Sequence, residues 1–62
     1  MLEKINNIIY KVHANPNPYA GHEFFVQEYP PAADGNWKIG KILFSGSKTE
    51  CFDYLETLRK QP

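Results

Sequence analysis

Cysteine, histidine and arginine are scarce in this 62-residue chain, which has one cysteine, two histidines and one arginine. A single cysteine excludes an internal disulfide framework. The Cys and His residues are also too few and too scattered to supply the four closely spaced ligands of a structural zinc site. We therefore expect neither a metal centre nor a cofactor. One cysteine, with no secretory signal in residues 1–7, favours a reducing cytoplasm as the location of the protein.

The charge is balanced, because seven basic and seven acidic residues give a formal net charge of zero. A dedicated nucleic-acid binder gains most of its affinity by neutralising phosphates with clustered Lys and Arg, so this balance argues against that function. It is also the charge state that protects least against self-association. The sequence contains no apolar run of about 18 residues, so we expect no transmembrane helix and no membrane partner.

The chain is long enough for one small domain, which we place at residues 1–62. A domain of this size buries only about 60% of the surface of its unfolded chain, so its core is small. Aromatic residues make up 15% of the sequence. We expect the missing stabilisation to come from dense aromatic packing or from self-association.

The stretch from Trp37 to Leu58 predicts the central part of the fold. Residues 37–44 are rich in aromatic and β-branched types and predict a strand. Its alternation is out of phase after Gly40, and one extra residue there restores it, so we predict a β-bulge near Gly40. Residues 45–47, Ser-Gly-Ser, end the strand.

A helix is predicted from Ser47 onward. Residues 47–50 match the capping box S-x-x-E, in which the serine and glutamate side chains bond to each other's backbone N–H groups. Cys51, Leu55 and Leu58 follow at i, i+4 and i+7 and form one apolar stripe. This stripe is expected to face the sheet.

Two further strands are predicted, at residues 5–13 and 22–29, from their alternating and β-branched patterns. Residues 14–21 contain two Asn-Pro pairs and predict a stiff connection, and residues 30–36 predict a loop with turn chemistry. The order β-β-β-α predicts an α+β fold, a three-stranded antiparallel meander with one C-terminal helix packed on one face of the sheet.

Candidate catalytic residues are few, because Cys51, His13 and His22 are the only classical nucleophile and imidazoles. Cys51 lies on the stripe that should face the sheet, so we interpret it as a small buried hydrophobic residue rather than a reactive thiol. The acidic residues are explained by helix capping and surface pairing, and no Gly-rich phosphate loop is present. We predict no catalytic residue and no enzyme activity.

The sequence favours a protein-binding surface over a catalytic site. If the helix covers one sheet face, aromatic residues remain on the other face and in the nearby loops, and such residues are typical of recognition surfaces. The predicted partner-binding residues are Tyr19, Phe25, Tyr29 and Trp37. The alternative is a second, minor core, formed if the Asn-Pro arm folds over that face. The strand at residues 5–13 is expected to be an edge that can accept a partner strand.

The main prediction is therefore a small non-catalytic interaction module, acting as an adaptor or as an inhibitor. Its partner is another protein, or a second copy of the chain in a homodimer formed by edge-strand or sheet-face pairing.

The predicted order of three strands and a helix over residues 24–58 resembles two families of DNA-binding domains in topology. These are the arm-binding N-terminal domains of tyrosine recombinases and the plant AP2-type domains. The resemblance implies binding of nucleic acid by the sheet face, and the residues available for it are Lys11, Lys38, Lys41 and Lys48. Those domains are basic and carry arginines on the sheet, whereas the single arginine here, Arg59, lies in the predicted helix.

Overall fold

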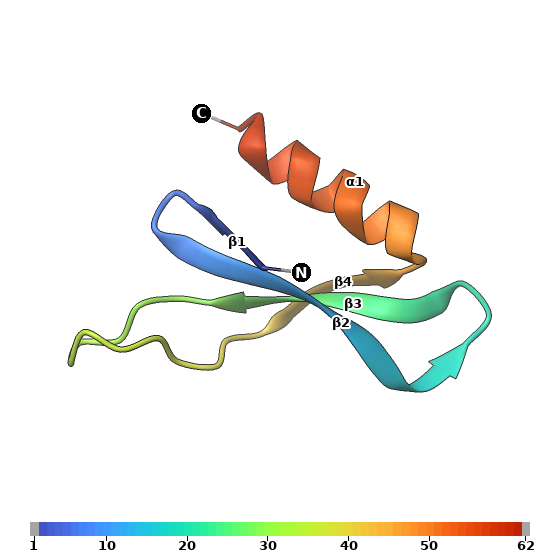
Figure 1. Cartoon of the computed structure of the whole chain (residues 1–62), viewed down its shortest axis with the longest axis horizontal. Helices are drawn as coiled ribbons and strands as arrows, with labels where there is room; N and C mark the ends of the chain where they lie inside the picture. Colours follow the sequence, from blue (N-terminus) through green and yellow to red (C-terminus); the bar gives the residue numbers. More distant parts are fainter. Residues whose placement is uncertain (1, 62) are drawn as a thin grey trace.

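The computed structural model describes residues 2–61 and has the architecture α+β, with one antiparallel sheet followed by one helix (Figure 1). The sheet has four strands in the order β1-β2-β3-β4, each hydrogen-bonded to the next in sequence. The bounds are β1 Leu2–Ile5, β2 Ile8–Tyr19, β3 His22–Tyr29, β4 Ile42–Gly46 and α1 Lys48–Arg59. The predicted antiparallel sheet and C-terminal helix are confirmed, but the predicted number of three strands is wrong.

The additional strand is β1, which forms a tight hairpin with β2. Asn6 and Asn7 connect the two strands with positive φ angles of 50° and 65°. Two-residue hairpin turns need such angles, and asparagine tolerates them better than most residues. The ladder runs from Ile5 opposite Ile8 to Leu2 opposite Lys11. The predicted edge strand at residues 5–13 is therefore wrong for residues 9–11, which pair with β1 on one side and with β3 on the other. Ile5 belongs to β1, which is an edge strand of the sheet.

The Asn-Pro segment, predicted as a connection, is the second half of β2. Its pairing with β3 is irregular between Ala14 and Tyr19, and Tyr19 then pairs with His22 across a turn that contains Gly21. Prolines cannot donate to a β-ladder, and both prolines of this segment fall in the irregular part. The segment extends the hairpin (Figure 1) and does not fold over the sheet face, so a second core of that kind is not formed.

Strand β4 begins at Ile42 rather than at Trp37, and its register shift is not near Gly40. The pairing moves from Val26 opposite Phe44 to Gln27 opposite Ile42, so Leu43 is the extra residue. Trp37 is joined to Pro31 by an isolated bridge.

Gly40 instead allows two backbones to approach closely. A Cβ atom at Gly40 would lie 2.7 Å from the carbonyl oxygen of Glu28 and 2.9 Å from Cδ of Pro30. The Gly40 N–H donates to that same Glu28 carbonyl at 3.0 Å. Glycine is needed here because a side chain would not fit between the two backbones.

The helix begins where the sequence predicts, with Ser47 as its N-cap. The Ser47 hydroxyl accepts from the Glu50 N–H at 3.2 Å, and the Glu50 carboxylate accepts from the Ser47 N–H at 2.9 Å. The capping box is thus confirmed. This bonding to the charged form also holds the pKa of Glu50 below its ordinary value. Cys51 and Leu55 are buried and Leu58 is half-buried, as the apolar stripe predicted.

The core lies between the helix and one face of the sheet. Its buried members are Ile5, Tyr10, Val26, Cys51 and Leu55. They are surrounded by half-buried apolar residues from β2, β3, β4 and α1. Within residues 2–61 no helix has both the length and the apolar character needed to cross a bilayer.

Candidate interaction surface

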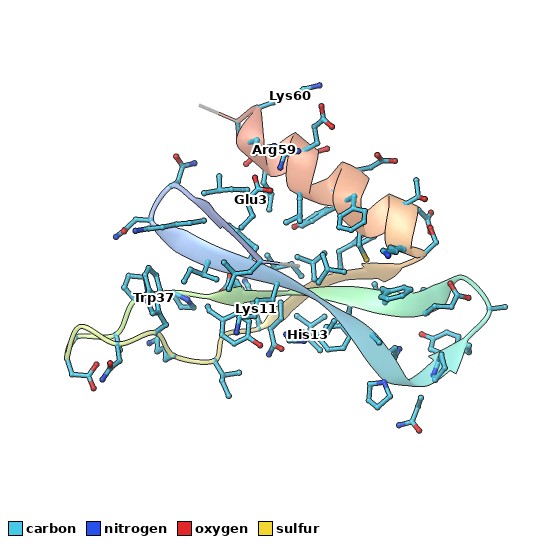
Figure 2. The ribbon with its side chains drawn as sticks, viewed as in Figure 1. Glu3, Lys11, His13, Trp37, Arg59 and Lys60 are labelled. Atoms are coloured by element: carbon cyan, nitrogen blue, oxygen red, sulfur yellow. The ribbon has the colours of Figure 1, made fainter. Side chains whose placement is uncertain are left out.

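Among residues 2–61, no element covers one of the two faces of the sheet. Pairing opposes Lys4 to Ile9, Lys11 to Gln27 and His13 to Phe25, which places these side chains on the face away from the helix. Figure 2 shows Lys11 and His13 on the opposite side of the sheet from Arg59 and Lys60. We call this surface the open face, and its residues are Leu2, Lys4, Ile9, Lys11, His13, Phe25, Gln27, Tyr29 and Ile42.

A chain of hydrogen bonds crosses the open face from β2 to the β3–β4 connection. His13 Nε2 lies 2.9 Å from the Tyr29 hydroxyl, and that hydroxyl donates to Oε1 of Gln27 at 3.3 Å. The Gln27 amide nitrogen then donates to the Gly40 carbonyl at 3.0 Å. Each side chain is fixed by the next, so this part of the surface is ordered in advance of any contact with a partner.

The bonds of this chain have only one consistent direction. The Gly40 carbonyl can only accept, which makes the Gln27 nitrogen the donor and leaves the Gln27 oxygen toward Tyr29. The single hydroxyl proton of Tyr29 is then used on Gln27. His13 must therefore donate through Nε2–H to the Tyr29 oxygen. The network thus selects one tautomer of the neutral His13 ring and leaves Nδ1 as an acceptor.

Two lysines of the open face lie over aromatic rings. The Lys11 ammonium is 4.8 Å from the centre of the Tyr29 ring, and the Lys4 ammonium is 5.4 Å from the Trp37 ring. Both distances are within the range of a cation–π contact. The Phe25 ring lies 5.2 Å from the His13 ring, which continues the aromatic surface along β2 and β3.

The four aromatic residues predicted to bind a partner are only partly brought together. Phe25 and Tyr29 lie on the open face, on either side of His13. Trp37 lies beside the open face through its contact with Lys4, and 40% of its surface is exposed. Tyr19 is 62% exposed but lies at the tip of the β2–β3 hairpin, where its ring stacks on His22.

The four lysines named for nucleic-acid binding do not share one surface. Lys11 lies on the open face, whereas Lys48 belongs to the helix and lies 6.0 Å from the ring of Phe52. The sheet therefore separates these two cations. Lys38 and Lys41 belong to the connection between β3 and β4.

Lys4, His13 and Gln27 were not among the residues predicted for partner binding. His13 and Gln27 carry the hydrogen-bond chain, and Lys4 provides the second cation. The alternation of residues 9, 11 and 13 along one strand was the available signal for His13. The placement of Lys4 on this face could not be predicted from alternation, because it depends on the hairpin turn at Asn6 and Asn7.

The open face does not combine with Cys51 into a catalytic pair. Cys51 is buried on the helix side of the sheet, whereas His13 lies on the open face. Burial raises the pKa of the Cys51 thiol and favours its neutral form. In the described part of the chain, no three His, Cys, Asp or Glu residues are grouped to hold a metal ion, and no pocket is present.

Comparisons with known proteins found no matching family model, no matching curated protein and no matching solved structure.

Proposed function

We propose that this protein is a small non-catalytic interaction module that binds another protein through the open face of its sheet. The observation that supports this is the ordered chain of His13, Tyr29 and Gln27 on a face that no described element covers. Side chains that are fixed before binding lose less entropy when a partner arrives. An adaptor and an inhibitor would both act by binding a partner protein through this face.

The composition of the surface supports a protein partner. Aromatic rings, apolar side chains and a few polar groups lie within one sheet face, as they do in the centres of protein interfaces. Ile42 is 57% exposed and Leu2 is 54% exposed, although both are large and apolar. Their exposure leaves apolar area on the open face for a partner to cover.

We place this function in a reducing cytoplasm. The single thiol of the chain, that of Cys51, is free and lies in the core, so the fold needs no oxidising compartment.

The test is a selection from a phage-displayed library of random twelve-residue peptides on the immobilised chain, followed by mapping on ¹⁵N-labelled protein. We expect the selected peptides to shift the amide signals of Lys11, Phe25 and Gln27. Ile42→Ser should weaken them, because it removes an exposed apolar contact. Thr57→Ser, on the exposed side of the helix, is the control and should bind them as the wild type does. Peptides that shift only helix signals would refute the proposal, and so would a selection that yields no binder.

A further inference from the structure

We propose that the partner segment recognised by the open face is acidic and extended, with carboxylates at alternate positions that pair with Lys4 and Lys11. This inference rests on the proposed function, because it names the chemistry of the partner that the same face would bind.

The first support is the segregation of the ion pairs. The ion pairs among residues 2–61 join Arg59 to Glu3, Arg59 to Glu56, and Lys60 to Glu56. All of them lie on the helix side of the sheet. Lys4 and Lys11 pair with no carboxylate of the described chain and lie over aromatic rings instead. Although the net charge of the molecule is zero, the two lysines give the open face positive charges that no carboxylate of the described chain pairs with.

The second support is the spacing of the two cations. Lys4 lies opposite Ile9, so Lys11 is its diagonal neighbour on the same face. Diagonal neighbours of this kind are roughly 7–8 Å apart at the backbone. An extended strand advances about 3.3 Å per residue, so side chains two positions apart are separated by nearly 7 Å and point to the same side. Alternate carboxylates on a strand thus match the spacing of the two lysines.

The third support is that Lys4 and Lys11 are like charges on diagonal positions of the same face. A partner segment with carboxylates near them is attracted by both ammonium groups. The apolar positions beside them, Ile9 and Ile42, would contact the side chains that alternate with the acidic ones.

The occupant is another protein rather than a second copy of this chain. The acidic residues of the sequence stand at positions 3, 23, 28, 34, 50, 53 and 56, and no two of these are separated by two positions. The chain therefore does not carry the pattern that its own open face fits. A nucleic acid is less favoured, because its affinity grows with the number of phosphates neutralised and this face offers two lysines.

The test uses synthetic peptides and a ¹⁵N-labelled chain at low salt. The probes are an extended twelve-residue peptide with Glu alternating with Leu and Tyr, a peptide of the same length with Gln in place of Glu, and a single-stranded oligonucleotide of thymidines. We expect the Glu peptide to shift the amides of Ile9, Lys11 and Gln27, and to bind roughly tenfold or more tightly than the Gln peptide. Lys4→Gln and Lys11→Gln should each weaken it by several fold. Lys60→Gln removes the same charge on the helix side and should leave its affinity unchanged (Figure 2).

The outcomes separate this inference from the proposed function. Equal binding of the Glu and Gln peptides at the open face would overturn the inference and leave the proposed function standing. Failure of both peptides, together with random-library binders that never map to the open face, would remove both. If the oligonucleotide binds the same residues more tightly than the Glu peptide does, the acidic protein segment is wrong and the ligand of this face is a nucleic-acid phosphate. A doubled mass of the free chain in light scattering, with the open face protected, would overturn it in favour of a second copy.

Discussion

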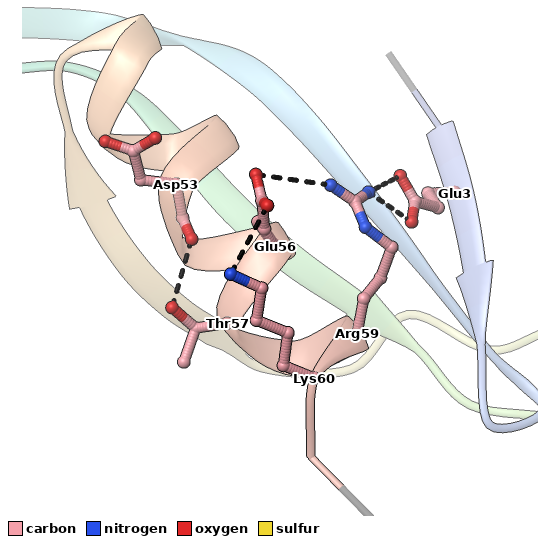
Figure 3. Close-up of polar contacts among 6 residues, drawn as sticks. All are labelled: Glu3, Asp53, Glu56, Thr57, Arg59 and Lys60. Carbon is pink, nitrogen blue, oxygen red and sulfur yellow. Dashed lines mark hydrogen bonds and ion pairs between the residues drawn. The ribbon is translucent and has the colours of Figure 1, made fainter.

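Arg59, in the last turn of the helix, forms an ion pair with Glu3 of the first strand, 56 positions away in the sequence (Figure 3). Both oxygens of the Glu3 carboxylate accept from the Arg59 guanidinium. The contact joins the two ends of the described chain on the helix side of the sheet. This bonding raises the pKa of Arg59 above its ordinary value, so the group stays charged.

Removal of this ion pair should lower stability by a small amount that depends on salt. Glu3→Gln keeps the size of the side chain and removes the charge, so the loss should shrink at high salt, where surface charges are screened. The measurement is the urea midpoint of wild type and variant at low and high salt. Lys60→Gln is the control, because it breaks only a pair within the helix. A loss from Glu3→Gln that is the same at both salt concentrations would contradict an electrostatic role.

Leu55→Ala should unfold most of the protein. Leu55 is 1% exposed and packs in the core between the helix and the sheet. Its truncation costs about 2–5 kcal/mol, and a domain of this size rarely has more than about 3–5 kcal/mol of net stability. The far-UV circular dichroism of the variant should therefore show the loss. Leu58→Ala, at a half-buried position of the same stripe, should cost less. An equal effect of the two changes would mean that the helix does not pack through Leu55.

The capping box gives a pH dependence whose sign is fixed by Glu50. The Ser47 N–H bonds to the Glu50 carboxylate and lowers the pKa of that group from its ordinary value of 4.5. The folded state therefore binds the proton less readily than the unfolded chain. This contribution to stability is complete above pH 4.5 and is lost as the pH falls through the lowered pKa.

Chemical denaturation at a series of pH values measures this contribution. Glu50→Gln should remove it, so the difference between wild type and variant should be largest at neutral pH and vanish in acid. Ser47→Ala removes the other half of the box and should cost about 1 kcal/mol. A difference between wild type and Glu50→Gln that persists unchanged in strong acid would show that the charge of Glu50 is not involved.

The parts of the fold that local chemistry specifies could be predicted from the sequence. Ser47, Glu50 and the stripe of Cys51 and Leu55 define the helix because capping and periodicity act within a few residues. The hairpin at Asn6 and Asn7 was missed, although two adjacent asparagines suit a turn with positive φ. The β-branched residues that follow the asparagines favour extended structure, so the sequence pattern predicted a continuous strand there instead of a turn.

Less of the candidate surface than of the fold could be predicted from the sequence. Phe25 and Tyr29 could be placed on one face, because alternation along a single strand is a local property. The link from Tyr29 to His13 and the position of Lys4 depend on the pairing of different strands. Pairing register depends on turns and bulges, and two of these, at residues 6–7 and 15–18, lie in segments that sequence patterns assigned to other structures.

Gly40→Ala should destabilise the protein and disturb the open face. The added methyl group would lie 2.7 Å from the Glu28 carbonyl oxygen, so the two backbones must separate. Overpacking of this kind typically costs about 1–3 kcal/mol. Because the Gly40 carbonyl accepts from Gln27, the backbone amide signals of Gln27 and Tyr29 should also shift in the ¹H–¹⁵N spectrum of the variant. Ile39→Ala, at a neighbouring residue that is 77% exposed, should change stability little. Gly40→Ala with wild-type stability would mean that the close approach is not needed.

The hydrogen-bond chain of the open face makes a prediction about a single proton. His13 should carry its hydrogen on Nε2, because the Tyr29 hydroxyl proton is used on Gln27 and its oxygen is left to accept. Long-range ¹H–¹⁵N spectra of the imidazole, recorded at alkaline pH, distinguish the two neutral tautomers. Tyr29→Phe keeps the ring and removes the hydroxyl, so His13 should lose its preference and stability should fall by about 0.5–1.5 kcal/mol.

His22 provides the internal control for this measurement. Its Nδ1 lies 2.9 Å from the Ser45 hydroxyl and takes no part in the chain, so its signals should not respond to Tyr29→Phe. An Nδ1–H tautomer of His13 in the wild type would reverse the direction of the bond to Tyr29. The hydroxyl would then donate to His13, the bond to Gln27 would be absent, and the open face would lose the fixed geometry on which the proposed binding depends.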